Sequence, residues 1–163
     1  MSFNSRYLIK IQSKNQVVMP SKLRDSEESD AMPKNYYLFS EDFIEVDSEK
    51  ESELSRRIMM YPLNIWNEVV QKMEDRLRKA NVKEVGKQIK IMRSSAKKVE
   101  LDTQNRFTLK KELIDLVGIR DKEVYFVGSG SKVEIWDKAS FEILINQYAT
   151  NIKQTFKDFV DDL

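Results

Sequence analysis

The segment Leu101-Asp102-Thr103-Gln104-Asn105-Arg106-Phe107 has a counterpart near the start of the chain, Ile11-Gln12-Ser13-Lys14-Asn15-Gln16-Val17. In both segments a polar turn separates apolar residues, and an asparagine takes matching positions in the turn. Asparagine is the residue other than glycine that best tolerates a positive φ angle. An offset of 90 residues superposes the two segments and also aligns Leu23 with Leu113. The chain is therefore predicted to contain two repeats of one unit, each built around a tight turn.

Strands are predicted on both sides of each turn, because the flanking segments are rich in aromatic and β-branched residues and several alternate in polarity. We expect the first two strands of the first repeat, 6–11 and 17–19, to pair as a β-hairpin. A short helical turn is expected after the second strand of each repeat, near Leu23 and Leu113. The predicted strands are residues 6–11, 17–19, 35–39 and 57–61 in the first repeat and 98–101, 106–109, 124–127 and 133–136 in the second.

One amphipathic helix is predicted at the end of each repeat, where apolar residues recur at steps of three and four. The first runs from Leu63 to Ala80, with Trp66 and Met73 expected in the core. The second begins after Asp137, a favourable N-cap. Its apolar stripe is longer than one small domain can cover, so we expect it to pack on something beyond its own repeat, such as another subunit. The stripe consists of Phe141, Leu144, Ile145, Tyr148, Ile152, Phe156, Phe159 and Val160.

The two repeats differ in length. An offset of 75 residues, not 90, aligns residues 57–61 with 132–136. The difference places an insertion in the first repeat, at about residues 25–55. The predicted fold is α+β and β-rich, with a first repeat at residues 1–82 that carries the insertion and a second at 83–163 that ends in the long helix.

The amino-acid composition disfavours most enzymatic functions. The 163 residues are 40% apolar and 34% charged, as in soluble globular proteins, and they include neither histidine nor cysteine. Their absence removes the commonest general base and the soft metal ligands. We therefore expect no catalytic site, cofactor or metal. The first residues do not resemble a secretion signal and the apolar runs are short, so we expect a cytoplasmic protein that does not span a membrane.

The net charge of +1 conceals two segments of opposite charge. Residues 41–53 hold seven acidic residues and one lysine, whereas residues 76–98 hold nine basic residues and one glutamate. A basic segment can add contacts to phosphates, and an acidic one would repel the same polyanion. Either segment could equally be ordinary solvated surface.

The second turn carries a charged pair that the first turn lacks. Asp102 and Arg106 flank it and are expected to face each other across it. An arginine held by a carboxylate loses less side-chain entropy on binding, and its planar fork suits a phosphate or a guanine edge. A surface ion pair with little effect on stability is the competing interpretation. In the first turn the matching residues are Gln12 and Gln16, neutral amides that can still hydrogen-bond to each other.

At these residues the chain resembles the MraZ family, a branch of the AbrB-like swapped-hairpin transcription factors. The family is marked by a duplicated motif of aspartate, three residues and arginine, which Asp102–Arg106 fits. Further matches are Met19-Pro20-Ser21-Lys22-Leu23-Arg24, Tyr61-Pro62-Leu63-Asn64-Ile65-Trp66, Asp121-Lys122-Glu123-Val124 and Glu134-Ile135-Trp136-Asp137.

The chain also departs from the family pattern. It lacks the first aspartate and arginine, and Asn15 and Asn105 stand in place of glycine. Lys110 stands in place of the second proline, and the acidic insertion is additional. The missing first pair bears most directly on affinity for DNA.

The resemblance implies a duplicated double-split β-barrel, ring-shaped homo-oligomers, and a nucleoid-associated repressor of a bacterial division and cell-wall gene cluster. It also implies binding to repeated promoter sites on double-stranded DNA. Arg106 would enter the groove, Asp102 would orient it, and lysines would position the protein on phosphates. The expected DNA-binding residues are Arg106, Asp102, Gln104, Asn105, Lys14, Gln16, Lys10 and Lys98.

The sequence is also compatible with two other functions. The loss of the first charged pair and the acidic insertion favour a diverged oligomeric binding or assembly protein without sequence-specific DNA recognition. An antitoxin related to AbrB, with a toxin as partner, is the third hypothesis, and the duplication argues against it.

Overall fold

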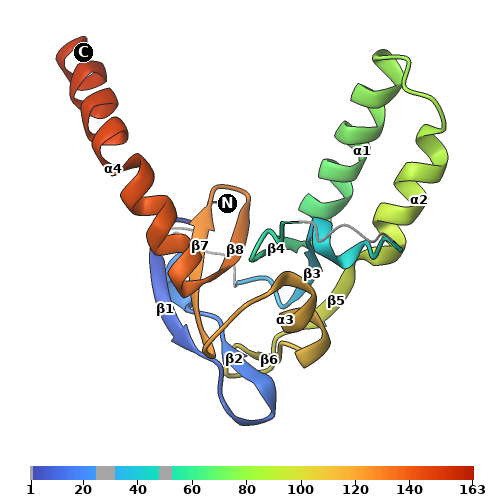
Figure 1. Ribbon diagram of the computed structural model, residues 1–163, viewed down its shortest axis with the longest axis horizontal. Helices are drawn as coiled ribbons and strands as arrows, with labels where there is room; N and C mark the ends of the chain where they lie inside the picture. Colours follow the sequence, from blue (N-terminus) through green and yellow to red (C-terminus); the bar gives the residue numbers. More distant parts are fainter. Residues whose placement is uncertain (1, 25–31, 48–52) are drawn as a thin grey trace.

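Two antiparallel sheets form the body of the protein in the computed structural model (Figure 1). The structure describes residues 2–24, 32–47 and 53–163. One sheet has six strands in the order β1-β7-β8-β4-β3-β5, and the other is the two-stranded ribbon β2–β6. The strands are β1 (Arg6–Lys10), β2 (Gln16–Val18), β3 (Asn35–Phe39), β4 (Arg57–Pro62), β5 (Lys97–Glu100), β6 (Arg106–Thr108), β7 (Glu123–Ser129) and β8 (Lys132–Asp137).

The helices leave this body at two places. Both predicted amphipathic helices form, and the structure adds an unpredicted helix, α2, inside the basic segment 76–98. Figure 1 shows α4 and the α1–α2 hairpin projecting from opposite flanks of the body and diverging. The α-helices are α1 (Leu63–Lys79), α2 (Val85–Ser95), α3 (Lys111–Val117) and α4 (Lys138–Asp161), and short 3-10 turns lie at Ser13–Asn15, Ser21–Leu23 and Glu41–Phe43.

The two repeats exchange their first strands. β1 of the first repeat pairs with β7 of the second, and β5 of the second pairs with β3 of the first. The ribbon likewise joins one strand from each repeat. The predicted hairpin between residues 6–11 and 17–19 is therefore wrong, although both strands form. Alternating polarity predicts a strand but does not specify which edge of a sheet it will join.

The register of the ribbon follows the duplicated sequence. Gln16 lies opposite Thr108, and Val18 lies opposite Arg106. An offset of 90 converts each of these pairs into the other. The ribbon therefore lies on an approximate two-fold axis between the repeats, which confirms the duplicated architecture.

The register of β4 and β8 follows the second offset. Ile58 lies opposite Ile135, and Met60 lies opposite Val133. An offset of 75 interchanges these two pairs. The extra length of the first repeat thus lies mainly between β3 and β4, where residues 40–56 replace the short 130–131 connection between β7 and β8. Residues 48–52 of the acidic segment, and residues 25–31, lie outside the described residues.

Two hydrophobic clusters stabilise the fold. The larger one fills the body with residues of both repeats, and the smaller one surrounds Trp66 under the helical hairpin. α2 covers α1 there, since Val85 and Ile89 are buried against it. Met73 was predicted in the core, but it is 39% exposed at the edge of this cluster because α2 crosses beside it and does not cover it.

Substitution of Gly128 tests the strand exchange. A Cβ at this position would lie 2.3 Å from the backbone nitrogen of Asn4, which precedes the exchanged strand β1. We expect Gly128→Ala to destabilise the protein by about 1–3 kcal/mol in urea unfolding, because the backbone must move apart.

Gly86→Ala is the matched control. No atom lies within 4 Å of a Cβ at Gly86, in the first turn of α2, so the change should be neutral or stabilise by up to about 1 kcal/mol. Equal effects of the two substitutions would contradict the close approach of the N-terminal segment to β7.

Candidate nucleic-acid interface

The β2–β6 ribbon presents one face to the core and one to solvent. Val17 and Phe107, its two central residues, are both buried in the main cluster. Because side chains alternate along a strand, Gln16 and Arg106 lie on the opposite, outward face. Figure 1 shows the ribbon at the end of the body away from the tips of the long helices.

The second turn is organised by the Asp102 carboxylate. Its Oδ1 accepts hydrogen bonds from the backbone N–H groups of Gln104, at 2.8 Å, and Arg106, at 2.9 Å. Its Oδ2 accepts from Nε of the Arg106 side chain at 2.9 Å. Asn105 takes a φ of 60°, the positive angle that the sequence predicts. The two charged side chains therefore face each other across the turn, as their spacing predicts.

The arginine is held by one side of its guanidinium group only. Among the residues that the structure describes, no hydrogen bond engages the two terminal nitrogens of Arg106, and the side chain is 40% exposed. These nitrogens carry the parallel N–H groups that bind a phosphate or a guanine edge in bidentate fashion. The turn thus orients a bidentate donor toward solvent.

The hydrogen bonds around Asp102 keep it ionised. The backbone N–H of Arg106 is the main cause that lowers the pKa of Asp102 below its ordinary value, assisted by the Arg106 side chain and the backbone of Gln104. Partial desolvation acts in the opposite direction and is outweighed. Asp102 is therefore ionised at neutral pH.

The first turn has a different backbone. Both Lys14 and Asn15 have a φ of 58°, whereas in the second turn only Asn105 has a positive φ. The backbone hydrogen bond that closes the first turn, from the N–H of Gln12 to the carbonyl of Gln16, has a counterpart between Asp102 and Arg106. In the described part of the chain no side-chain bond joins Gln12 to Gln16, so the hydrogen bond allowed by their chemistry does not form. Glutamine is one methylene longer than aspartate, which places its amide too far out to cap the turn.

Lys34 is a basic residue of this site that sequence reasoning missed. Its ammonium group donates to Oδ1 of Asn105 at 2.7 Å, and its carbonyl accepts from the backbone N–H of Leu101. In the other repeat the carbonyl of Lys122 accepts from the backbone N–H of Ile11 in the equivalent way. No pattern in the sequence around Lys34 marks it as a residue of this site. Only its equivalence to Lys122 in the other repeat could have done so.

The predicted lysines lie in different surroundings. Lys98 lines a shallow pocket of about 290 Å³ together with Lys97, Thr108 and Lys110, beside the ribbon. Lys14 is exposed in the first turn. Lys10 ends β1 directly opposite Glu123 of β7. The structure thus brings Arg106, Asp102, Gln104 and Asn105 together in one turn and places Gln16 on the same ribbon.

The described residues contain neither a metal site of acidic residues nor a membrane-spanning helix. No group of three or more acidic side chains is arranged there to hold a metal ion. No described helix is long and apolar enough to cross a membrane.

Comparison with known proteins shows a similarity to the MraZ family. The model of the family described as "MraZ protein, putative antitoxin-like" matches residues 92–162. A protein of Finegoldia magna named transcriptional regulator MraZ is 26% identical over 162 residues, which cover 99% of this chain and 96% of the relative. The chain is thus similar to the MraZ family model in its second half and to this MraZ protein over nearly its whole length.

Two further proteins named MraZ show the same similarity. Transcriptional regulator MraZ of Acetivibrio thermocellus is 26% identical over 86% of this chain and 84% of the relative. That of Christiangramia forsetii is 31% identical over 63% of this chain and 57% of the relative. The segment matched by the MraZ family model contains the charged second turn, whereas the uncharged first turn lies outside it.

Titration of Asp102 tests the geometry of the turn without any ligand. In carboxyl-detected NMR, Asp102 should titrate below the ordinary aspartate range in the parent. Arg106→Ala should raise its pKa only part of the way back, because the backbone N–H of residue 106 is retained. An unchanged pKa in the variant would show that the two side chains do not interact in solution.

Proposed function

We propose that this chain is a transcriptional regulator of the MraZ type that binds double-stranded DNA through the β2–β6 ribbon. The observation that carries the proposal is the Arg106 guanidinium, held through Nε by Asp102, while its side chain is 40% exposed and its two terminal nitrogens have no hydrogen bond among the described residues. The names of the relatives support the same function.

Arg106 is the proposed base-reading residue. A two-stranded ribbon fits the major groove, where a bidentate arginine recognises O6 and N7 of guanine. Asp102 is the proposed positioning residue. Gln104 and Asn105 lie in the same turn and complete the contact with the groove.

The proposed phosphate contacts come from lysines around the ribbon. Lys34 and Lys98 flank the second turn, and Lys14 and Lys10 belong to the first. Such contacts position the protein but carry no sequence information, and they make affinity depend on salt. Gln16 adds a neutral hydrogen-bonding group on the ribbon.

One charged turn per chain makes a weak site, so we propose that several chains act together. In a ring-shaped homo-oligomer, neighbouring chains would engage repeated promoter sites and gain affinity through their high effective concentration. On this proposal the protein is a nucleoid-associated cytoplasmic repressor of a division and cell-wall gene cluster, without catalytic activity. Its two structural repeats would be residues 1–82 and 83–163.

Substitution at Arg106 tests the proposed base contact. Arg106→Gln gives the second turn the side chain that the first turn has at Gln16. Binding to fragments selected from a random DNA pool, measured at fixed salt, should weaken by about 10- to 100-fold, the range expected for loss of one bidentate base contact.

The control for this experiment is Gln16→Ala, at the equivalent position of the first turn. It removes a neutral amide and should weaken binding far less. Binding of Arg106→Gln as tight as that of the parent would refute the proposed role of the second turn.

Introducing the charged pair into the first turn tests the same proposal through an expected gain in DNA affinity. The double substitution Gln12→Asp and Gln16→Arg should create a second cap and a second held arginine, because the two turns occupy equivalent places in the ribbon. We expect affinity to rise by about tenfold in the same assay. Gln16→Arg alone is the control for added charge, and an equal gain from it would show that charge alone is responsible.

The alternative is a diverged MraZ-like assembly protein that has lost sequence-specific DNA binding. The neutral pair Gln12 and Gln16 favours it. Phosphate neutralisation makes affinity fall steeply between low and moderate salt. No retention on DNA even at low salt would support the alternative.

A further inference from the structure

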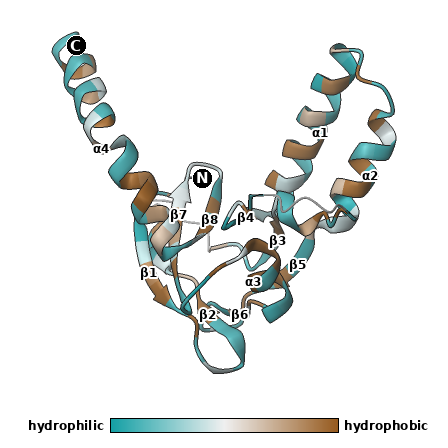
Figure 2. Cartoon of the chain, viewed as in Figure 1, coloured by the Kyte–Doolittle hydropathy of each residue, from teal (hydrophilic) through white to brown (hydrophobic). Residues whose placement is uncertain are grey.

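A cavity of about 480 Å³ opens between the α1–α2 hairpin and strands β3 and β4. Figure 2 shows hydrophobic segments on both helices where they approach the body. Glu41 and Ile44, from the connection between β3 and β4, also line the cavity. The corresponding connection in the second repeat consists of residues 130–131 alone. The longer connection of the first repeat therefore helps to enclose a space on that side of the molecule.

The floor of the cavity is aromatic and buried. Trp66 is 2% exposed, Phe39 7% and Tyr61 8%. The ring centroid of Trp66 lies 5.4 Å from that of Phe39 and 5.6 Å from that of Tyr61, and both pairs are tilted. Tilted rings offer faces and edges against which a further ring can pack. The floor therefore suits a flat apolar molecule.

The rim of the cavity consists of adaptable side chains. Met73 is 39% exposed and Ile91 51%, while Met92 is partly buried. Methionine side chains adjust easily to the shape of a bound molecule. Small-molecule sites occupy roughly 300–1,000 Å³ and are mostly apolar with a few polar groups. The cavity has the size and the lining of such a site.

One buried polar group at the cavity has unused hydrogen-bonding capacity. The hydroxyl of Tyr61 donates to Sδ of Met59, another lining residue, at 3.6 Å. Among the described residues no group donates to the hydroxyl oxygen. Sulfur is a weak acceptor, and a buried tyrosine hydroxyl usually has a stronger partner. The Tyr61 oxygen is thus available to accept a hydrogen bond from a ligand.

The surroundings of this hydroxyl keep it protonated. Burial raises the pKa of Tyr61, and the carboxylates of Glu134 and Glu41 add to the rise, whereas Arg57 opposes it. Glu41 itself lines the cavity and is paired with Arg57 through Oε1 only. Because the oxygens of Tyr61 and Glu41 are acceptors, the cavity favours a ligand that donates a hydrogen bond.

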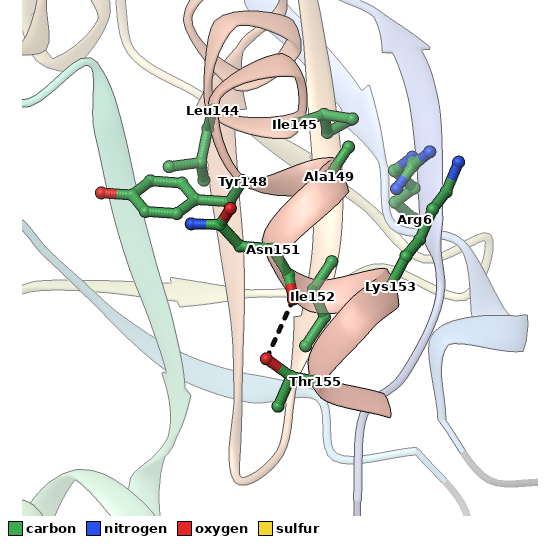
Figure 3. A pocket seen from close by; sticks show the side chains of 9 residues that line it. All are labelled: Arg6, Leu144, Ile145, Tyr148, Ala149, Asn151, Ile152, Lys153 and Thr155. Atoms are coloured by element: carbon green, nitrogen blue, oxygen red, sulfur yellow. Dashed lines mark hydrogen bonds between the residues drawn. The ribbon is translucent and has the colours of Figure 1, made fainter. Parts of the chain in front are cut away.

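A second apolar hollow, along α4, lacks such a group. Figure 3 shows Ile145, Tyr148 and Ile152 bordering this groove, with Arg6 beside it. Tyr148 is 52% exposed and Ile152 60%. An open surface of this kind has no buried acceptor with which to select a ligand that carries a donor. The α4 groove therefore serves as a control for non-selective apolar binding.

We propose that the α1–α2 cavity binds a small uncharged aromatic molecule that carries one N–H or O–H donor, such as an indole or a phenol. Its ring packs on Trp66, and its donor bonds to the hydroxyl oxygen of Tyr61. The inference goes beyond the proposed DNA binding and does not rest on it.

The test titrates the isotope-labelled chain by NMR with indole and with benzofuran, which has nearly the same shape but no N–H. Indole should shift the side-chain N–H signal of Trp66. Benzofuran should bind about 3- to 10-fold more weakly, the range expected for one hydrogen bond. Tyr61→Phe keeps the ring and removes the oxygen, so this variant should bind the two compounds equally and bind benzofuran as the parent does.

Two exposed isoleucines give matched variants that locate the site. Ile91 is 51% exposed at the rim of the cavity, and Ile152 is 60% exposed in the α4 groove. Ile91→Asp places a charge at the mouth of the cavity and should weaken binding of both compounds by about tenfold or more. Ile152→Asp should leave the binding of both unchanged.

Four results would overturn the proposal. They are a Trp66 signal that indole does not shift at millimolar concentration, as when a protein surface already covers the cavity, equal binding of the two compounds by the parent, a preference for indole that survives in Tyr61→Phe, and weakening by Ile152→Asp as large as that by Ile91→Asp. None of them alters the expected effect of Arg106→Gln on DNA binding, so the two proposals fail independently.

Discussion

The pairing of β2 with β6 is the contact on which the rest of the structure depends. Val17 and Phe107 meet at its centre with their side chains in the core, and the approximate two-fold axis between the repeats passes through this pair. The exchange of β1 and β5 follows the same axis and places strands of both repeats in one sheet. Neither repeat could bury its core without the other, because each supplies an edge strand to its partner.

This symmetric framework carries two unequal turns and two unequal helical arms. Asp102 caps one turn and holds Arg106, whereas Gln12 leaves the other turn to close through its backbone alone. α1 is covered by α2, whereas α4 is left open. In each case one difference, a longer neutral amide in place of a carboxylate or an added helix, gives equivalent positions different binding properties. The resulting division assigns the proposed DNA contact to the second repeat.

Much of the fold could be predicted from local pattern. The strands, both amphipathic helices, the Asp137 cap and the positive φ of Asn105 all follow from preferences of a few neighbouring residues. α2 was not predicted although Val85, Ile89 and Met92 recur at helical steps, because so few apolar residues in a basic segment are equally typical of solvated surface. Lys34 could not be found locally, since it reaches Asn105 from a distant part of the chain.

The sequence by itself determined the two turns, the type of each element and the presence of a charged pair in only one repeat, because dihedral preference, periodicity and side-chain length act over a few residues. Only the tertiary structure decided that β1 and β2 pair with the second repeat, that Met73 stays exposed and that the stripe of α4 has no cover. Those outcomes depend on which surfaces meet across long sequence separations, and alternating polarity is satisfied equally well by several partners.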